Sequence, residues 1–336
     1  MLLLQSPVAL LLSVRPNLPR AAPPVCAAPP LPSLRAAVIV PGFLSDESDF
    51  VPLADELIAR GIPTSVVPMK LWHWLPVIGG RSVRPVLERI DHAVRHVAVQ
   101  AGTEGAPLRV PPIAYGLGDV WAEFWSNPGG VANVGGSAEP DEYPSVVPRG
   151  RFPPPSGEPL GRIAVIGHSA GGYMARIYCS DRAYGGKAYG GSALVHSLVT
   201  LGTPHAVGNG VPFVHVEWAN REPSIAGVAK LAVGATGTPG DSSGDLTLGA
   251  YSFCTASGSG GELLDGDGVT TTESSVAWEG AETLLLSGVT HYPWTAAPLA
   301  DQVAPELTQA YREGKPWYGD ADALSQWLPW LEKQFE

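Results

Sequence analysis

Six short, mostly apolar runs are the feature of this sequence that most limits its fold. Each run is four or five residues long and is followed by glycine, proline or a polar residue. Runs of this kind are typical of parallel strands that are buried on both faces of a sheet. We therefore expect strands at residues 37–40, 64–67, 163–166, 197–201, 229–233 and 283–286.

Apolar residues recur at helical spacing between these runs. The first such segment, residues 50–58, has Ser48 or Asp49 as its expected cap and Gly61 as its stop. The last lies around residues 322–335, and we expect Pro329 to bend or break it. Strands that alternate with helices predict an α/β fold with a mainly parallel, doubly wound sheet. Further helices are expected at residues 83–97 and 170–178.

The predicted folded region is a single domain, residues 35–336, with one insert. Residues 102–160 lose the periodicity and are expected to form an irregular excursion over the surface. Residues 1–45 contain no Asp or Glu and only three Arg, as organelle transit peptides do. Residues 1–34 are thus predicted to be a plastid leader. The alternatives are a disordered tail, and a secretory or cytoplasmic location for the protein.

Charge and cysteine spacing exclude several kinds of partner. The net charge is −11 and no basic stripe is present, which argues against a nucleic-acid-binding protein. The apolar runs are too short to span a membrane, so contact with a membrane would be peripheral. The three cysteines lack metal-ligand spacing, and we predict no metal, cofactor or protein partner. Cys179 is expected to be buried.

A G-x-S-x-G pattern occurs twice in the chain, at residues 167–171 and 240–244. With 40 glycines in 336 residues, the letters alone carry little information. The first copy follows a predicted strand and precedes an apolar helical face, whereas we expect no regular element on either side of the second. Ser169 is therefore predicted to be a nucleophile on a strained turn. Ser242 is predicted to be a surface-loop serine.

A nucleophilic serine needs a base and an acid, which should follow it in the order acid, then histidine. His291 follows the last predicted strand, whereas His205 comes too early and His215 lies in an apolar stretch expected to be irregular. Asp267, 24 residues before His291 in a glycine turn, is the favoured acid, and Asp265 stays open as the alternative. The sequence Asp-Gly-Asp-Gly also begins calcium loops, but the twelfth position is Val276 rather than Glu.

Backbone N–H groups should stabilise the oxyanion that such a reaction forms. We expect them from Ala170, at the start of a helix, and from Phe43, or Leu44, in the loop after the first strand. Residues 205–228 are predicted to form a cap. Its apolar side chains either bind an acyl chain or simply pack; the candidate substrate contacts are Leu44, His168, Phe213, Val214 and Trp218.

Five blocks of sequence, in order, resemble the lipase and esterase branch of the α/β-hydrolase family. They are VIVPGF, VIGHSAGG, LVTLGTPH, GDGVTTTESS and LSGVTH. The chain is most similar to lipase-like hydrolases of cyanobacteria and plastids, and more distantly to lipid-deacylating enzymes that share the LGTPH segment. The resemblance implies that Ser169, His291 and Asp267 form a triad with Phe43 and Ala170 as the oxyanion hole. Pro41 stands where many lipases have His.

The expected activity is hydrolysis of lipid or other apolar carboxylic esters through an acyl-enzyme. Thioester hydrolysis or another acyl transfer on the same triad is one alternative. A binding protein that keeps the hydrolase fold without turnover is the alternative from a different class, although such a protein has no need of all three triad residues.

Overall fold

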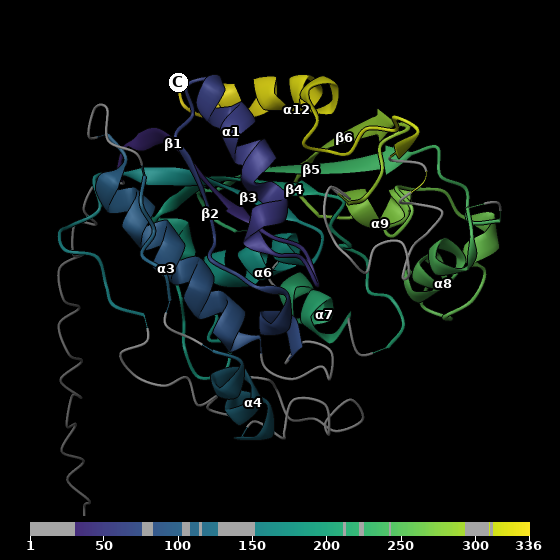
Figure 1. Cartoon of the computed structure of the whole chain (residues 1–336), viewed down its shortest axis with the longest axis horizontal. Helices are drawn as coiled ribbons and strands as arrows, with labels where there is room; N and C mark the ends of the chain where they lie inside the picture. The colour runs from purple at the N-terminus through teal and green to yellow at the C-terminus, as the bar shows by residue number, and fades with distance from the viewer. Residues whose placement is uncertain are drawn as a thin grey trace, which may run out of the picture. The chain divides into compact units, whose positions relative to one another are not determined.

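The six predicted strands are present and form one sheet in this computed structural model (Figure 1). The strand order is β2-β1-β3-β4-β5-β6, and all neighbours are parallel, which confirms the mainly parallel α/β fold. The chain leaves β1 in one direction to reach β2 and returns to the other side of β1 to form β3. The strands are β1 Ser33–Val40, β2 Thr64–Val66, β3 Arg162–His168, β4 Val195–Leu201, β5 Ala229–Thr236 and β6 Glu282–Ser287.

The folded region begins slightly earlier than expected. Residues 31–336 form one compact unit, and β1 already pairs with β3 at Ser33, inside the predicted leader. The rest of that leader, and most of the predicted insert, lie outside the described residues. The structure describes residues 31–75, 83–102, 108–113, 116–126, 152–210, 213–221, 225–241, 243–292, 309 and 312–336.

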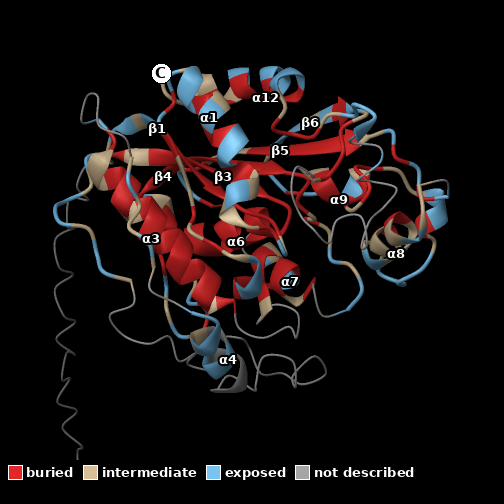
Figure 2. Ribbon diagram, in the orientation of Figure 1, coloured by how far each residue is buried: buried red, intermediate tan, exposed pale blue. Residues whose placement is uncertain are grey.

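Helices cover both faces of the sheet, as the doubly wound prediction requires (Figure 1). Alternate residues of β1 face opposite layers: Val38 and Val40 pack with one set of helices, Ala37 and Ile39 with the other. On the first face lie α3 Arg84–Gln100, α6 Ala170–Cys179 and α7 Val214–Asn220; on the second lie α1 Val51–Ala59 and α12 Ala321–Lys333. The sheet and the inner sides of these helices are buried (Figure 2).

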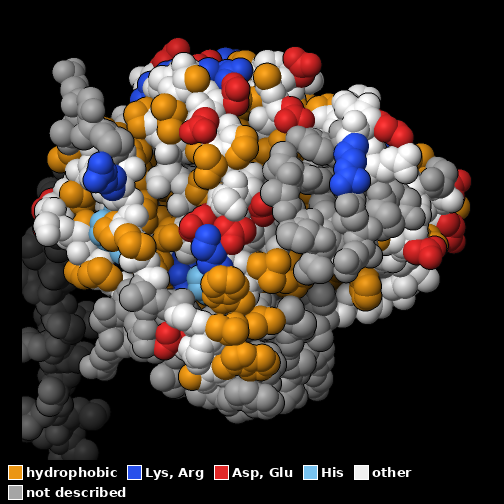
Figure 3. Space-filling view, in the orientation of Figure 1, with side chains coloured by type: hydrophobic (Ala, Val, Ile, Leu, Met, Phe, Trp, Pro, Cys, Tyr) orange, Lys and Arg blue, Asp and Glu red, His pale blue; other side chains and the backbone are white. Residues whose placement is uncertain are grey.

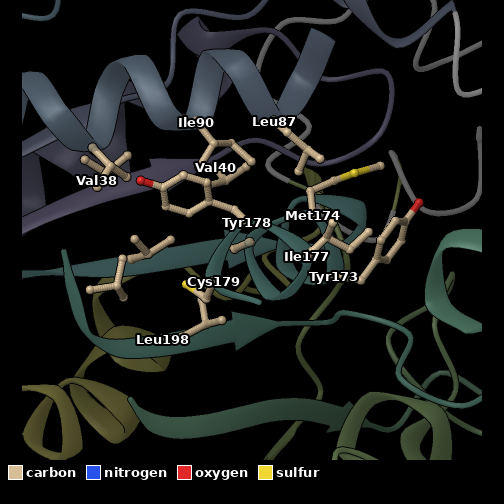
Figure 4. Close-up of a cluster of buried hydrophobic side chains, with 14 of the residues drawn as sticks. Val38, Val40, Leu87, Ile90, Tyr173, Met174, Ile177, Tyr178, Cys179 and Leu198 are labelled. Carbon is tan, nitrogen blue, oxygen red and sulfur yellow. The ribbon is translucent and has the colours of Figure 1, made fainter. Parts of the chain in front are cut away.

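The core between α3, β1 and α6 positions the helix that follows Ser169. Figure 4 shows Tyr178 and Ile177 of α6 among side chains of β1 and α3. The Tyr178 hydroxyl reaches Oδ1 of Asp91 at 3.3 Å, so its polar end is satisfied inside this core. Cys179 is buried there, as expected, and burial raises the pKa of its thiol. Helix α6 is thereby fixed along its whole length.

Three local predictions differ from the structure. The first helix is preceded by a 3₁₀ turn, η1 Glu47–Phe50, which Asp46 caps in place of Ser48 or Asp49. Pro329 does not break α12, because buried Trp327 and Leu331 hold the helix on the sheet on both sides of it. The predicted irregular insert contains a helix, α4 Leu117–Ser126, whose first turn is favoured by Asp119, which accepts the N–H of Gly116.

Shorter elements connect the main ones. They are η2 Leu71–Trp74, η4 Gly191–Ala193, α8 Asp245–Phe253, η6 Gly261–Leu263 and α9 Thr272–Val276.

Candidate active site

Ser169 is a strained residue between β3 and α6. Its φ of 50° and ψ of −126° lie in a region that L-residues rarely adopt. The turn is tight because glycines flank it: a Cβ on Gly171 would strike the carbonyl oxygens of Val40 and Pro41. Ser169 itself is 7% exposed. The predicted strand, turn and helix around this serine are therefore present.

The loop after β1 lies directly against this turn. A Cβ on Gly42 would come within 3.0 Å of the Ser169 Cβ atom. Leu44, in the same loop, has a φ of 58°. Among the described non-glycine residues, only Leu44 and Ser169 have a positive φ. No hydrogen bond between described residues engages the N–H of Phe43 or of Ala170. Both groups are thus available to an oxyanion beside Ser169.

This juxtaposition follows from the sheet order. Strands β1 and β3 are neighbours, and the chain leaves them toward opposite edges of the sheet. In open α/β sheets, ligands bind outside the carboxyl ends of the strands at such a reversal. The loop 41–44 and Ser169 occupy those two carboxyl ends.

His291 and Asp267 form a buried pair. Nδ1 of His291 donates to Oδ2 of Asp267 at 2.7 Å, and the backbone N–H of His291 donates to the Asp267 carbonyl oxygen at 2.9 Å. Oδ1 of Asp267 accepts the N–H groups of Val269 at 3.0 Å and Thr270 at 2.7 Å. Burial alone would raise the pKa of Asp267, but the charge and hydrogen bond of His291 and these N–H groups hold it below its usual value.

The structure separates the two candidate acids. Asp265 accepts the N–H of Gly237 with both carboxylate oxygens, at 3.0 and 2.9 Å. Asp267 is fully buried and is the carboxylate that faces His291. The two remaining candidate bases are engaged elsewhere, since His205 contacts Arg176 and His215 contacts Tyr184.

The other ring nitrogen of His291 is available as a base. With a proton on Nδ1, Nε2 carries the lone pair, and this buried atom has no hydrogen-bond partner among the described residues. The backbone of Ser169 is linked to the surroundings of His291. Its N–H donates to the carbonyl oxygen of Leu201, and a Cβ on Gly202, the residue after Leu201, would lie 3.1 Å from Nδ1 of His291. Hydrogen bonds between nucleophile and base are often long until substrate binds.

Tyr318 is a site residue that the sequence did not reveal. Its hydroxyl donates to Oδ2 of Asp267 at 2.8 Å. The two residues are 51 positions apart, and Tyr318 stands in a Trp-Tyr-Gly-Asp turn that fits no motif of the chain. The position of Trp317 and Tyr318 directly before an amphipathic helix was the one weak signal.

His168 holds the backbone of the base. The side chain is fully buried, and Nε2–H donates to the carbonyl oxygen of His291 at 2.7 Å, while the expected contact of His168 with substrate stays a prediction. Its ring lies 4.8 Å from the His291 ring. Burial first, and then the charge of His291, lower the pKa of His168 to about 3, so this imidazole is neutral.

The predicted cap, residues 205–228, contains a packed helix, α7, in the stretch that was expected to be irregular. Phe213 and Trp218 are buried in the core, and Trp218 packs edge-on against Tyr184 at 5.3 Å, in line with the packing alternative. Arg176 holds the end of α7 by donating to the carbonyl oxygen of Ala219 and to Asn220 Oδ1. For Val214, half-buried, and Leu44, 42% exposed, contact with substrate stays a prediction.

The second G-x-S-x-G copy has more structure around it than expected. Helix α8 begins at Asp245, directly after Gly244, so the prediction that no helix follows was wrong. Aspartate in the first turn favours a helix start that the surrounding glycines obscured. Strand β5 ends at Thr236, before the pattern begins, whereas β3 runs into Ser169. Ser242 lies outside the described residues.

Comparison with known proteins gives no relative: neither a family model nor a curated protein matches this chain. In the part of the chain that the structure describes, no helix has the length and apolar character needed to cross a membrane. The same residues contain no group of three or more His, Cys, Asp or Glu side chains arranged to hold a metal ion.

Proposed function

We propose that this protein is a serine hydrolase of the α/β-hydrolase type that cleaves carboxylic esters. The observation that carries the proposal is the strained Ser169 directly after His168, whose ring lies 4.8 Å from that of His291, a buried histidine whose Nδ1 is bound to a buried carboxylate. A serine held at positive φ and a histidine with a free Nε2 have a clear use together, because proton transfer makes the hydroxyl a nucleophile.

The proposed mechanism assigns one step to each group. Nε2 of His291 takes the Ser169 proton while the oxygen attacks the ester carbonyl, and Asp267 stabilises the imidazolium that forms. The N–H groups of Phe43 and Ala170 hold the oxyanion. His291 then gives its proton to the leaving alcohol, and water attacks the acyl-enzyme in the same way to release the acid.

An apolar substrate is the class that the surroundings favour. Leu44 is exposed beside the strained turn. Figure 3 shows hydrophobic side chains gathered over η2 and α4, and the contacts between these two elements make them neighbours. The exposed apolar residues there are Leu71, Trp72, Leu117 and Trp121. A surface of this kind suits an acyl chain or an ester at a lipid surface.

A fluorophosphonate probe tests this proposal without knowledge of the substrate, because it reacts with an activated serine. We expect the protein to be labelled at Ser169 and Ser169→Ala not to be labelled. Removing the base in His291→Ala should slow labelling by roughly a thousandfold or more. The readout is labelling rate with mass-spectrometric identification of the modified residue.

Ser242→Ala is the matched control, since it removes the serine of the other G-x-S-x-G copy. Its labelling rate should equal that of the unaltered protein. Absence of labelling in the unaltered protein, or labelling that persists in Ser169→Ala, would contradict the proposed function. A screen against glycerolipids, short acyl esters and thioesters then identifies the substrate.

A further inference from the structure

The carboxylate of Asp267 has two donors on each oxygen. Val269 and Thr270 bind Oδ1 through their backbone N–H groups. His291 and Tyr318 both bind Oδ2, at 2.7 and 2.8 Å. The conventional triad accounts for His291 alone on Oδ2, so the tyrosine is an additional donor on the oxygen that faces the base.

Tyr318 is held in this position from several directions. The indole N–H of Trp327 in α12 donates to the Tyr318 carbonyl oxygen at 3.0 Å. Two residues before Tyr318, the Pro316 carbonyl oxygen accepts the N–H of Thr290 at 2.7 Å, and Thr290 directly precedes His291. Tyr318 is fully buried. The segment that carries the tyrosine is therefore tied both to α12 and to the loop that carries the base.

The contact between Tyr318 and Asp267 requires a residue without a side chain at position 202. Gly202 has a φ of 56°, and a Cβ there would lie 2.6 Å from Oδ2 of Asp267 and 2.9 Å from Cε2 of Tyr318. Any side chain at this position would therefore displace the carboxylate or the tyrosine ring. This explains in physical terms why glycine directly follows β4, which ends at Leu201.

We propose that Tyr318 is a positioning residue of the hydrolytic site: it fixes the Asp267 carboxylate against His291 and limits the negative charge that this carboxylate offers to the imidazole. The proposal rests on the proposed function of Ser169 and His291. A hydrogen bond donated to a carboxylate stabilises its negative charge, so two donors on one oxygen share the negative charge of that oxygen. Without the hydroxyl, the same carboxylate stabilises a protonated His291 more strongly.

The tyrosine, cysteine and histidine side chains around the pair stay neutral. Burial raises the pKa of Tyr318, Tyr251, Tyr292 and the Cys254 thiol, and the negative charge of Asp267 adds to each. Burial lowers the pKa of His168. Asp265, the remaining acidic neighbour, is held by Gly237. Asp267 is the carboxylate hydrogen-bonded to His291, and Tyr318 acts on the base through it.

Tyr318→Phe tests the proposal because it removes the hydroxyl and keeps the ring. The readout is the rate of fluorophosphonate labelling as a function of pH, which falls on the acid side as His291 becomes protonated. We expect the midpoint of this acid limb to move upward by roughly half to one pH unit. The plateau rate should fall about three- to tenfold, because the carboxylate loses one of its fixed partners.

Tyr251→Phe is the matched control. Tyr251 is also fully buried, and its hydroxyl donates to Thr238 and accepts the N–H of Gly268, so it contacts the backbone of the same acid loop but not the carboxylate. If Tyr318 serves only to pack the loop, both variants should behave alike. An acid limb that is unchanged in Tyr318→Phe, or shifted equally in Tyr251→Phe, would overturn the proposal.

The two proposals fail in different ways. Labelling at Ser169 with an unmoved acid limb in Tyr318→Phe rejects the role of Tyr318 and leaves the hydrolase standing. If the unaltered protein is not labelled, the hydrolase fails, and the Nδ1–H resonance of His291 followed by NMR still decides the effect of Tyr318. The pH at which this resonance titrates should then move upward in Tyr318→Phe and stay in place in Tyr251→Phe.

Discussion

Ser169 and Leu44 concentrate backbone strain on the two sides of one small space. Both have positive φ, at 50° and 58°, and neither is a glycine. Strain of this kind costs roughly 1–3 kcal/mol per residue and persists where the surroundings impose it. Here two glycines permit the close contact that holds the strained residues. Because Gly42 and Gly171 have no side chains, the loop after β1 packs directly against the turn at Ser169 and the start of α6.

Gly171→Ala tests this contact at the scale of one methyl group. The new Cβ would strike the carbonyl oxygens of Val40 and Pro41, which are backbone atoms and cannot turn aside. We expect a loss of roughly 1–3 kcal/mol in the free energy of unfolding. Labelling of Ser169 should fall at least tenfold, which corresponds to about 1.4 kcal/mol in the activation barrier, because the oxyanion donor of Ala170 is displaced. Urea unfolding and labelling rates measure the two effects.

Gly249→Ala in α8 is the control, because a Cβ at this position meets no atom within 4 Å. Alanine is the better helix former by about 1 kcal/mol, so this variant should be as stable as the unaltered protein or more so. Equal destabilisation of the two variants would mean that the close approach at Gly171 has no special importance.

Between elements, a hydrogen bond ties the end of β3 to the loop after β6. His168 closes β3 and donates to the carbonyl oxygen of His291, so the element that carries the serine also holds the backbone of the base. His168→Leu removes this donor. We expect the labelling rate of Ser169 to fall by roughly tenfold, because the base is no longer held in register with the nucleophile.

His168→Gln separates the hydrogen bond from packing, since the glutamine amide can donate from nearly the same position. This variant should keep its labelling rate within a few fold of the unaltered protein. If the leucine and glutamine variants lose the same activity, the hydrogen bond is not what positions His291.

The central strands β3 and β4 are almost completely buried, and the sequence predicted them as apolar runs, because a parallel strand covered on both faces has few polar positions. The edge strands β2 and β6 are largely half-buried or exposed, so their apolar signal is weaker. Helices α7 and α8 were missed since glycines and a short apolar run surround them, and their stability comes from contacts such as those of Arg176 with Ala219 and Asn220. Tertiary contacts of this kind leave no local pattern.

The site residues likewise fall into those that the sequence could place and those that only the structure revealed. Ser169, Asp267 and His291 each follow or lie beside a recognisable strand or turn, so the sequence could place them and their order could link them. The choice of Asp267 over Asp265 needed the structure, because two residues in one turn differ in the direction of their side chains. Tyr318 joins Asp267 from a distant segment, and sequence spacing carries no information about that contact.

At the scale of the whole molecule, burial lowers the pKa of five histidines in the part of the chain that the structure describes. Burial is the main cause in each case: it lowers the pKa of His73 and His168 to about 3 and that of His196 to about 4. It also lowers the pKa of His92 and His205. An unfolded chain protonates these side chains near their usual pKa of about 6.5, so it binds more protons than the folded state does below that pH.

Stability should therefore fall as the pH drops below about 6.5, with the loss continuing toward pH 4. Each histidine contributes up to about 1.4 kcal/mol per pH unit to this loss. Urea midpoints measured between pH 7.5 and 4.5 test it. His196→Gln keeps a donor for the Leu34 carbonyl oxygen but does not titrate, so its dependence on pH should be shallower. A flat profile from pH 7.5 to 5 would contradict the expectation.

The spread of the site along the chain has a consequence for its synthesis. Phe43 and Ser169 are translated well before Asp267 and His291, and Tyr318 comes later still. A nascent polypeptide thus carries the serine for a long interval with no base beside it. Under the proposed mechanism, the reactivity that Ser169 gains from His291 arises only after these distant segments of the chain have met.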